Sequence, residues 1–214
     1  KNEGEVELAL LEHCIRDNLN YSAERRLAVL KPLKVVIENF PEGKIEWLPA
    51  LNNPNSDKHE QRKIPFSREI WIEQDDFMEE PSKKFFRLAP GKEVRLRYAF
   101  FVTCNAVIKD EDGEIVELRC SYDPETRGGN APDGRKVKGT IHWVSAEHAK
   151  DAEVRIYNSF YNTPSPGRER DFIGDINPNS LEVLENCKIE PDLVTLDDNV
   201  PIQFERLGYF YKDP

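Results

Sequence analysis

The sequence predicts an all-β fold with one leading helix, and three observations carry this prediction. Short runs rich in β-branched and aromatic residues recur along most of the chain. The 15 prolines fall mostly between these runs, where strand chemistry tolerates them. Turn signals such as Asp112-Gly113 and Asp133-Gly134 separate neighbouring runs. This spacing is typical of one or two small barrels.

The helix is expected at the start of the chain. The apolar residues that fall near helical spacing are Val6, Ala9, Leu10, Cys14 and Leu19. Their spacing predicts a helix over Val6–Leu19. Acidic residues precede and open this segment, which suits the positive end of the helix dipole. Asn18 and Asn20 provide the stop signals.

The strands are expected in eight runs. They are Leu33–Glu38, Ile45–Leu48, Glu69–Ile72, Glu93–Ile108, Glu114–Tyr122, Lys136–Val144, Glu153–Tyr157 and Ile202–Tyr211. The segment Asp110–Gly113 lies between two long runs and predicts a hairpin.

Composition excludes several classes of protein. Of the 214 residues, 38% are hydrophobic and 10% aromatic, which is too much for wholesale disorder and enough for a core that buries roughly 70% of the unfolded surface. No apolar run approaches about 18 residues, so no transmembrane helix and no membrane partner are expected. The polar N-terminus has no signal-peptide core, and the absence of an initiator Met suggests a piece of a longer chain.

The cysteines and histidines form no recognisable metal site. None of the four cysteines lies in a C-x-x-C pair, so no zinc cluster is expected. Without a secretory signal, they are expected to be reduced thiols in a cytoplasmic protein. The four histidines show no metal-ligand spacing.

Charge is distributed unevenly along the chain. The net charge of −10 disfavours a general nucleic-acid binder, because like charges repel a polyanion. Glu69–Glu80 holds six acids and no base, whereas Lys83–Arg97 holds six bases against one acid and Arg127–Lys138 holds four against one. A net acidic protein therefore carries two local basic segments.

The segment Val94–Arg97 alternates apolar and cationic residues. In a strand, Arg95 and Arg97 would share one face about 7 Å apart. This spacing suits adjacent phosphates, or a phosphate and a guanine edge. Phe85–Arg87 lies upstream and offers a stacking surface for unpaired bases. The alternative is a solvated strand face whose arginines pair with the abundant carboxylates.

A second alternating segment lies near the C-terminal end. Ile202 and Phe204 would face one way, and Gln203 and Glu205 the other. Gln both donates and accepts, and Glu accepts from base amino or imino groups, so this pair could read a base edge. The alternative is an ordinary half-buried strand with its polar residues outward.

The adjacent acids indicate no glycosidase. Asp75-Asp76 and Asp197-Asp198 fit solvated turns, because a glycosidase needs two carboxylates on different elements, about 5–9.5 Å apart. The sequence also contains no G-x-S-x-G nucleophile elbow, no P-loop and no G-x-G-x-x-G motif.

Four segments together resemble one known family. They are Ile64–Ile72 (IPFSREIWI), Gly91–Arg97 (GKEVRLR), Asp133–Val144 (DGRKVKGTIHWV) and Gln203–Phe210 (QFERLGYF). Each resembles a segment of the C-terminal anticodon-binding region of glutaminyl-tRNA synthetases, and the likeness runs in order along nearly the whole chain. The related archaeal and eukaryotic glutamyl-tRNA synthetases are one alternative. A non-RNA β-barrel that binds a carbohydrate or a protein is the other.

The resemblance implies two six-stranded β-barrels of a ribosomal-protein-like kind, preceded by a short helical connector. Residues 1–24 would form the connector to a catalytic part. Residues 25–45 and 143–214 would form the barrel proximal to that part, and residues 46–142 the distal barrel. Both basic segments would then lie in the distal barrel.

The resemblance also implies which residues hold the anticodon, whose first base varies and is followed by U and G. By motif, Arg25, Gln203 and Glu205 match residues that hold the middle base. Arg87 matches a residue at the third base, and Arg95 matches one near the first base. Further candidates are Arg97, Lys84, Asn52 and Arg206. Phe86 stands where a basic residue of relatives would contact a phosphate or a base.

The family's HIGH-type and KMSKS-type ATP-binding signatures belong to an N-terminal Rossmann domain and do not occur in this sequence. The resemblance therefore implies that the chain binds the anticodon loop of tRNA(Gln) without catalytic residues, metal or cofactor of its own. The parent enzyme would be a cytoplasmic monomer that joins glutamine to this tRNA with ATP and Mg²⁺, and its catalytic domain would lie earlier in the same chain.

Overall fold

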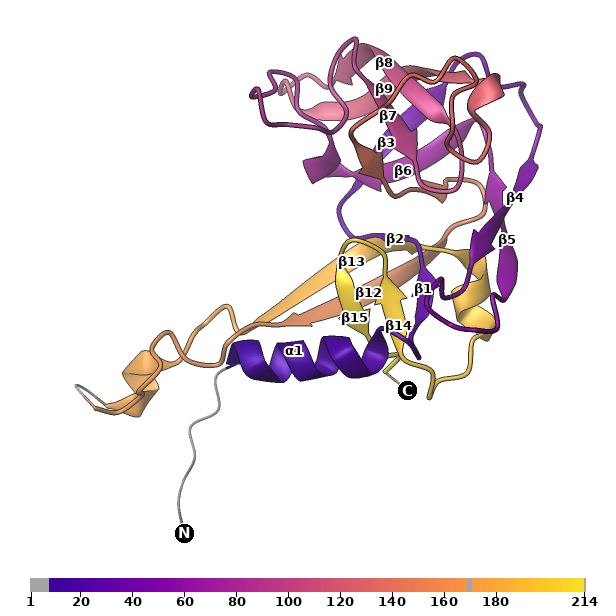
Figure 1. Cartoon of the computed structure of the whole chain (residues 1–214). Coiled ribbons are helices and arrows are strands. Elements are labelled where there is room, and N and C mark those ends of the chain that lie inside the picture. Colours follow the sequence, from indigo (N-terminus) through magenta and orange to yellow (C-terminus); the bar gives the residue numbers. More distant parts are fainter. Residues whose placement is uncertain (1–7, 169–170, 214) are drawn as a thin grey trace.

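The computed structural model describes residues 8–168 and 171–213. One helix, α1 (Leu8–Leu19), leads into two lobes of strands that a two-stranded ribbon joins along one side (Figure 1). The predicted helix is confirmed from Leu8 onward, and its expected first residues lie outside the described part of the chain. Within that part, no helix is long and apolar enough to cross a membrane.

A seven-stranded sheet forms the upper lobe of Figure 1. Its strands in chain order are β3 (Pro32–Ile37), β6 (Glu69–Glu73), β7 (Glu93–Leu96), β8 (Phe101–Lys109), β9 (Ile115–Asp123), β10 (Thr140–Ile141) and β11 (Val144–Ser145). They lie side by side in the order β10-β7-β8-β9-β3-β6-β11. The core of this lobe centres on Phe66, whose ring lies 5.0, 5.2 and 5.1 Å from those of Phe40, Phe100 and Trp143.

Two three-stranded sheets form the lower lobe. One has the order β1 (Glu24–Arg26), β14 (Ile202–Phe204), β15 (Gly208–Phe210), and the other β12 (Lys150–Tyr157), β13 (Leu181–Ile189), β2 (Ala28–Val29). A small apolar cluster that includes Leu193 and Phe204 fills this lobe. β12 and β13 extend together away from the lobe as a long arm beside α1 (Figure 1).

The ribbon consists of β4 (Glu46–Leu51) and β5 (Gln61–Phe66). At one end, Leu48, Ile64 and Phe66 are buried in the core of the upper lobe. At the other end, Arg62 forms an ion pair of 2.5 Å with Glu190, which follows β13 in the lower lobe. The ribbon thus joins the lobes through apolar contacts at one end and charged contacts at the other.

The predicted fold class is confirmed, since strands and one leading helix make up the regular structure. The expected arrangement of two barrels with six strands each is not confirmed, because the strand pairings give four sheets of three, seven, three and two strands. β3 pairs with β6 and β9, and β11 pairs with β6, so residues 32–37 and 144–145 both belong to the sheet of the upper lobe. The hairpin at Asp110–Gly113 is confirmed between β8 and β9.

Two of the predicted runs each contain a turn. Glu93–Ile108 is divided into the antiparallel strands β7 and β8, and Tyr98 between them has a φ of 65°. Ile202–Tyr211 is the hairpin β14–β15, in which Arg206 has a φ of 71°. Left-handed turn positions usually carry Gly, Asn or Asp, so Tyr and Arg gave no turn signal.

Other departures have a similar local cause. Lys136–Val144 is mostly irregular and contributes only to β10 and the start of β11. Strands β1, β2, β5 and β13 were not predicted. β13 is exposed along most of its length on both faces, so its sequence shows no apolar alternation to indicate a strand.

Candidate nucleic-acid interface

The alternation predicted for β7 is present in the structure. Val94 and Leu96 are 1% and 0% exposed and face the core, whereas Arg95 is only half-buried on the other face. The Arg95 guanidinium lies 5.4 Å from the centre of the Phe101 ring. Within the described residues, no carboxylate pairs with Arg95, and its Nε atom has no hydrogen-bond partner. Arg95 is therefore a cation that the fold holds in place without neutralising it.

The turn after β7 contacts the turn after β14 across the boundary between the lobes. Arg97 Nε lies 2.7 Å from Oε2 of Glu205, and the Tyr98 hydroxyl donates a short hydrogen bond to Oε1 of the same carboxylate. The Arg97 guanidinium also lies 4.8 Å over the Tyr98 ring. Glu205 is 6% exposed, so its charge is neutralised by groups from the opposite lobe.

Arg206, the next residue, forms a second contact between the lobes. Its guanidinium donates bonds of 2.6 and 2.7 Å to the two oxygens of Asp76, and it lies 2.9 Å from Nδ1 of His142. Arg87 Nε lies 3.3 Å from Asp76, and Arg87 Nη1 donates to the carbonyl of Asp75 at 2.8 Å. Asp76 thus binds two of the predicted site arginines.

Asp76 corrects one expectation from the sequence. The pair Asp75-Asp76 fitted a solvated turn, but Asp76 is only 2% exposed. It lies in a short 3₁₀ turn (Gln74–Asp76) that places its carboxylate against Arg87 and Arg206. A buried carboxylate needs such charged partners.

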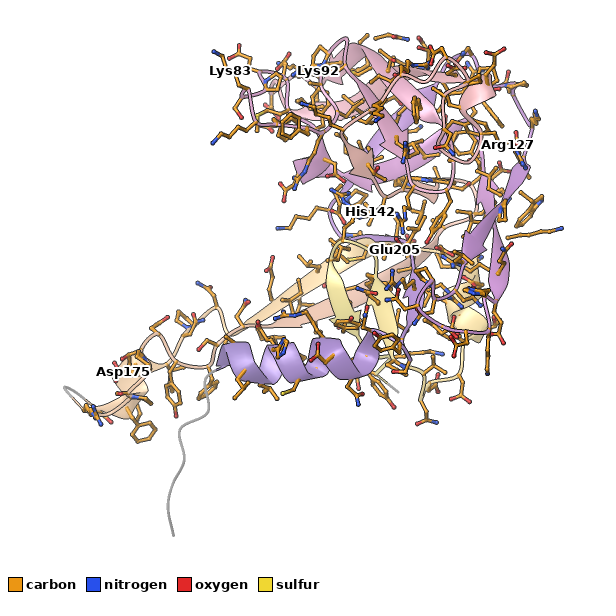
Figure 2. The ribbon with its side chains drawn as sticks, in the orientation of Figure 1. Lys83, Lys92, Arg127, His142, Asp175 and Glu205 are labelled. Carbon is orange, nitrogen blue, oxygen red and sulfur yellow. The ribbon has the colours of Figure 1, made fainter. Side chains whose placement is uncertain are left out.

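A cavity of about 240 Å³ lies beside these groups. Its ionisable lining residues come from both lobes and are Lys31, Glu73, Asp75, Asp76, Arg87, His142, Glu182 and Arg206. Figure 2 places the labelled His142 and Glu205 close to the boundary between the lobes. Both signs of charge and several donors therefore line one hollow at the junction.

Arg25, Asn52 and Gln203 lie together on the lower side of the junction. Arg25 is the register partner of Gln203 in the parallel pair β1–β14. Its backbone amide donates to the Asn52 carbonyl at 2.6 Å, and its Nη2 donates to Asn20 Oδ1 at 3.3 Å. No described side chain bonds the Gln203 amide group, which leaves it available to a base edge.

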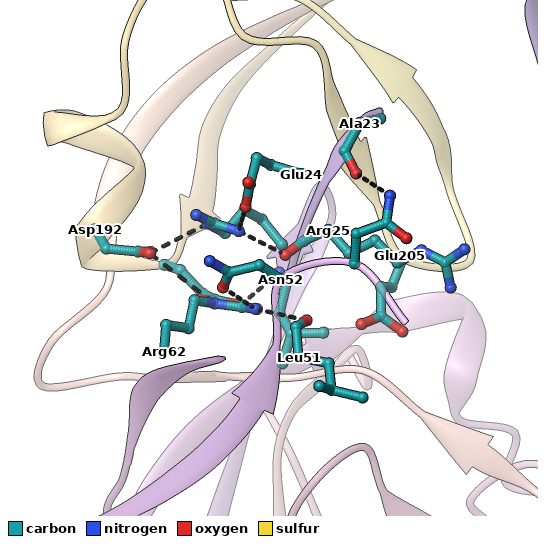
Figure 3. Close-up of polar contacts among 12 residues, drawn as sticks. Ala23, Glu24, Arg25, Leu51, Asn52, Arg62, Asp192 and Glu205 are labelled. Atoms are coloured by element: carbon teal, nitrogen blue, oxygen red, sulfur yellow. Dashed lines mark hydrogen bonds and ion pairs between the residues drawn. The ribbon is translucent and has the colours of Figure 1, made fainter. Parts of the chain in front are cut away.

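Arg26, beside Arg25, has a different role. It is 3% exposed, and its guanidinium donates to Glu24 and to the Arg25 carbonyl, both at 2.9 Å, and lies 3.1 Å from Asp192. Figure 3 labels these three partners. Arg26 is thus a buried structural cation, whereas the neighbouring Arg25 is the more accessible of the two.

A buried ion pair between Arg62 and Glu190 supports the group formed by Arg25, Asn52 and Gln203. Arg62 donates bonds of 2.6 and 2.5 Å to the two oxygens of Glu190, and Glu190 also accepts a bond of 2.6 Å from the Leu27 amide. Burial raises the pKa of Glu190, and the Arg62 charge opposes that rise only in part. Arg62 also donates to the Leu51 carbonyl at 3.1 Å, which holds the end of the ribbon next to Asn52.

The loop before β7 carries exposed groups. Lys84 is exposed, and Phe86 is 51% exposed with Lys138 Nζ 4.9 Å over its ring. A side chain at Gly139 would overlap the Phe86 carbonyl oxygen. The two backbones are therefore in close contact, and they fix the place from which the Phe86 ring projects.

A larger hollow lies elsewhere and suits RNA less well. About 790 Å³ in volume, it lies between β12 and the hairpin β14–β15 and is lined mainly by apolar groups such as Val154 and Phe210. Its two cations are already paired, Arg155 with Glu153 and Asp213, and Lys212 with Asp198. An unpaired cation such as Arg95 is not among its lining residues.

Four of the nine predicted site residues meet at the junction of the lobes, namely Arg87, Arg97, Glu205 and Arg206. Arg25, Asn52 and Gln203 adjoin one another below it, while Arg95 and Lys84 make no ion pair with a described residue. Sequence reasoning missed Tyr98, Asp76 and His142. Their partners are remote in sequence. The one sequence signal was at His142, which lies within Asp133–Val144, a segment that resembles the family.

The described residues contain no group of three or more side chains suited to a metal ion, and their four cysteines are free thiols. The predicted site residues, with Phe86 beside them in the chain, bring together arginines, an amide, a carboxylate and an exposed aromatic ring. Together with the strands that present them, these groups define an all-β module suited to the unpaired nucleotides of an RNA loop.

Comparisons with known proteins give the family. Two models described as the anticodon-binding domain of class I tRNA synthetases (E and Q) match residues 23–123 and 140–213. The chain belongs to this family, as the resemblance in its sequence segments indicated.

Curated glutamine–tRNA ligases are similar over essentially the whole chain. The one from Bradyrhizobium diazoefficiens is 60% identical over 208 residues, which is 97% of this chain and 37% of the relative. Those from Nitrobacter winogradskyi and Aliivibrio fischeri are 54% and 53% identical over 213 residues, which is 100% of this chain and 38% of each relative. The chain thus spans less than two fifths of the length of these relatives.

Proposed function

We propose that this chain reads the anticodon of tRNA(Gln) as the C-terminal region of a glutamine–tRNA ligase. The single observation that carries the proposal is the unpaired guanidinium of Arg95 on β7, in a protein whose net charge is −10. The fold surrounds most other arginines with carboxylates but leaves this one free, as a phosphate or base contact requires.

In this proposal the anticodon bases are splayed out so that their edges can be read. Gln203 and Glu205 test the middle base, Arg87 holds the third and Arg95 binds near the first. Lys84, Arg97, Arg206, Asn52 and Arg25 provide further contacts to phosphates and bases. A mismatched base leaves a buried donor or acceptor unpaired, which costs on the order of 1–3 kcal/mol.

The parent protein would join glutamine to this tRNA with ATP and Mg²⁺ in a catalytic domain outside this chain. We propose that it acts as a cytoplasmic monomer. The three curated relatives support the ligase activity by their names, and each is more than twice as long as this chain. The division into a connector, a proximal barrel and a distal barrel belongs to the same proposal.

The test is a titration of the chain against RNA stem-loops that differ only in the anticodon, at two salt concentrations. The chain should prefer CUG over loops with a changed second or third base. Arg95→Ala should weaken binding and reduce the slope of log K against log salt by about 0.7, as the loss of one phosphate contact does on single strands.

Arg119→Ala is the matched control. Arg119 lies in the same lobe, and its partner Glu117 keeps a second cation, Lys34, after the change. It should leave both affinity and slope near those of the unchanged chain. Equal affinity for all anticodons would refute the proposal, and a preference for C in the middle would select a glutamate-specific module instead.

A further inference from the structure

We propose that Tyr98 is a positioning residue for base reading: its hydroxyl fixes the Glu205 carboxylate in the orientation that tests the middle base. This inference rests on the proposed function and adds to it a residue that the sequence motifs did not indicate. It also explains why a tyrosine occupies a turn position with an unusual backbone conformation.

The backbone of Tyr98 is the first argument. Its φ of 65° lies in the left-handed region, which a bulky residue rarely adopts. Such a conformation costs on the order of 1–3 kcal/mol and persists only where the surroundings enforce it. Arg206, beside Glu205, has a φ of 71°. The two turns that meet across the lobes therefore each contain a strained residue next to the shared carboxylate.

The geometry around Glu205 is the second argument. Each carboxylate oxygen has one partner from the same turn, Oε1 with the Tyr98 hydroxyl and Oε2 with Arg97. Each oxygen keeps a further lone pair that can accept from an imino or amino group of a base. Two partners from one turn fix both the position and the rotation of the carboxylate, as a single partner could not.

The anchoring of Tyr98 is the third argument. Its ring packs against the core of the upper lobe, while its hydroxyl reaches a residue of the lower lobe. Burial, together with the Glu205 charge, raises the pKa of Tyr98 to about 12. The phenol therefore stays protonated at neutral pH and acts only as a donor to Glu205, which leaves Glu205 an acceptor toward RNA.

The consequence for recognition is specific to one base. Without the hydroxyl, Arg97 is the one side chain among the described residues that still binds the carboxylate, and it can draw the carboxylate into a two-pronged ion pair. Glu205 would then no longer face the base, and a uracil with an N3–H donor would lose its advantage over cytosine. Contacts to the third base, which involve Arg87, would persist.

The experiment measures binding of the 214-residue chain and its Tyr98→Phe variant to three stem-loops with the anticodons CUG, CCG and CUA. Phe keeps the ring and removes only the hydroxyl. We expect Tyr98→Phe to lower the preference for U over C at the middle position by about tenfold, the effect of one lost hydrogen bond to a charged group. The preference for G over A at the third position should stay unchanged.

Tyr122→Phe is the matched control, because Tyr122 is another half-buried tyrosine of the upper lobe and its hydroxyl forms no hydrogen bond with a described residue. It should change neither preference. Glu205→Gln combined with Tyr98→Phe should lower the middle-base preference no further than Glu205→Gln alone. Such non-additivity identifies residues that act through one another.

Two outcomes would overturn the inference. One is a middle-base preference that survives Tyr98→Phe, and the other is an equal loss at the middle and third positions, which would indicate general loosening of the site. If the unchanged chain itself prefers no anticodon, the proposed function fails first, and this inference fails with it.

Discussion

Arg206 binds Asp76 with two parallel hydrogen bonds, 2.6 and 2.7 Å long, that join the turn between β14 and β15 to the opposite lobe. Asp76 is 2% exposed, so this pair is shielded from water on the carboxylate side. Together with the adjacent Glu205, which binds Arg97, it makes this short turn a charged contact between the lobes.

Removing Arg206 should destabilise the protein. Among the described residues, Arg206→Ala leaves the buried Asp76 with Arg87 as its one cationic partner, and loss of one partner of a buried pair costs about 3 kcal/mol. Urea denaturation at pH 7 measures the free energy of unfolding. Arg155→Ala is the control, since its exposed pairs with Glu153 and Asp213 should contribute less than about 1 kcal/mol. Similar losses for both variants would contradict the prediction.

Acid should weaken the fold through Glu73. Burial alone would raise the pKa of Glu73, but His142 and the amides of Leu30 and Lys31 hydrogen-bond its carboxylate and lower the pKa overall. A carboxyl with a lowered pKa contributes stability above its unfolded pKa of about 4.3, and that contribution is lost as the pH falls through the folded pKa.

The measurement is the free energy of unfolding at several pH values from 7 down to 3. Glu73→Gln should be less stable than the unchanged chain at pH 7 and should lose less stability below about pH 4.3. Glu111→Gln, the same chemical change in the exposed loop of the β8–β9 hairpin, should follow the unchanged chain. Parallel curves for Glu73→Gln and the unchanged chain would exclude this role of Glu73.

Phe86 should contribute to RNA binding by stacking. Its ring is 51% exposed, with Lys138 Nζ 4.9 Å over it, and stacking of a base on an aromatic ring is worth about 1–3 kcal/mol. Phe86→Ala should weaken binding by that amount in a fluorescence titration without changing the salt slope, because Phe carries no charge. Phe172→Ala, on the distant arm and 54% exposed, is the control. Equal affinities for both variants would reject a stacking role.

Gly139 should tolerate no side chain. A Cβ at this position would overlap the carbonyl oxygen of Phe86, so Gly139→Ala must push two backbones apart at a cost of about 1–3 kcal/mol. At Gly208 the nearest atom to an added Cβ is 3.7 Å away, an ordinary contact. Gly208→Ala should therefore change the thermal midpoint little. A stable Gly139→Ala variant with full RNA affinity would show that the loop can move freely.

The outward face of β7 could be read from the sequence because strand alternation is a local property. Arg95 and Arg97 alternate with Val94 and Leu96, and the structure keeps both apolar residues buried. The turns at Tyr98 and Arg206 could not be read in this way. Both residues have left-handed conformations and make contacts across the lobes, and neither residue type favours such a conformation by itself.

The sequence by itself determined the all-β class, the leading helix, the family and the two basic segments, because each depends on local pattern or on long familiar segments. Only the tertiary structure decided which cations are free. Arg87, Arg97 and Arg206 are bound by carboxylates, whereas Arg95 is not. Coulomb pairing depends on distance in space, and folding brings Glu205 to Arg97 and Asp76 to Arg206 across long stretches of chain.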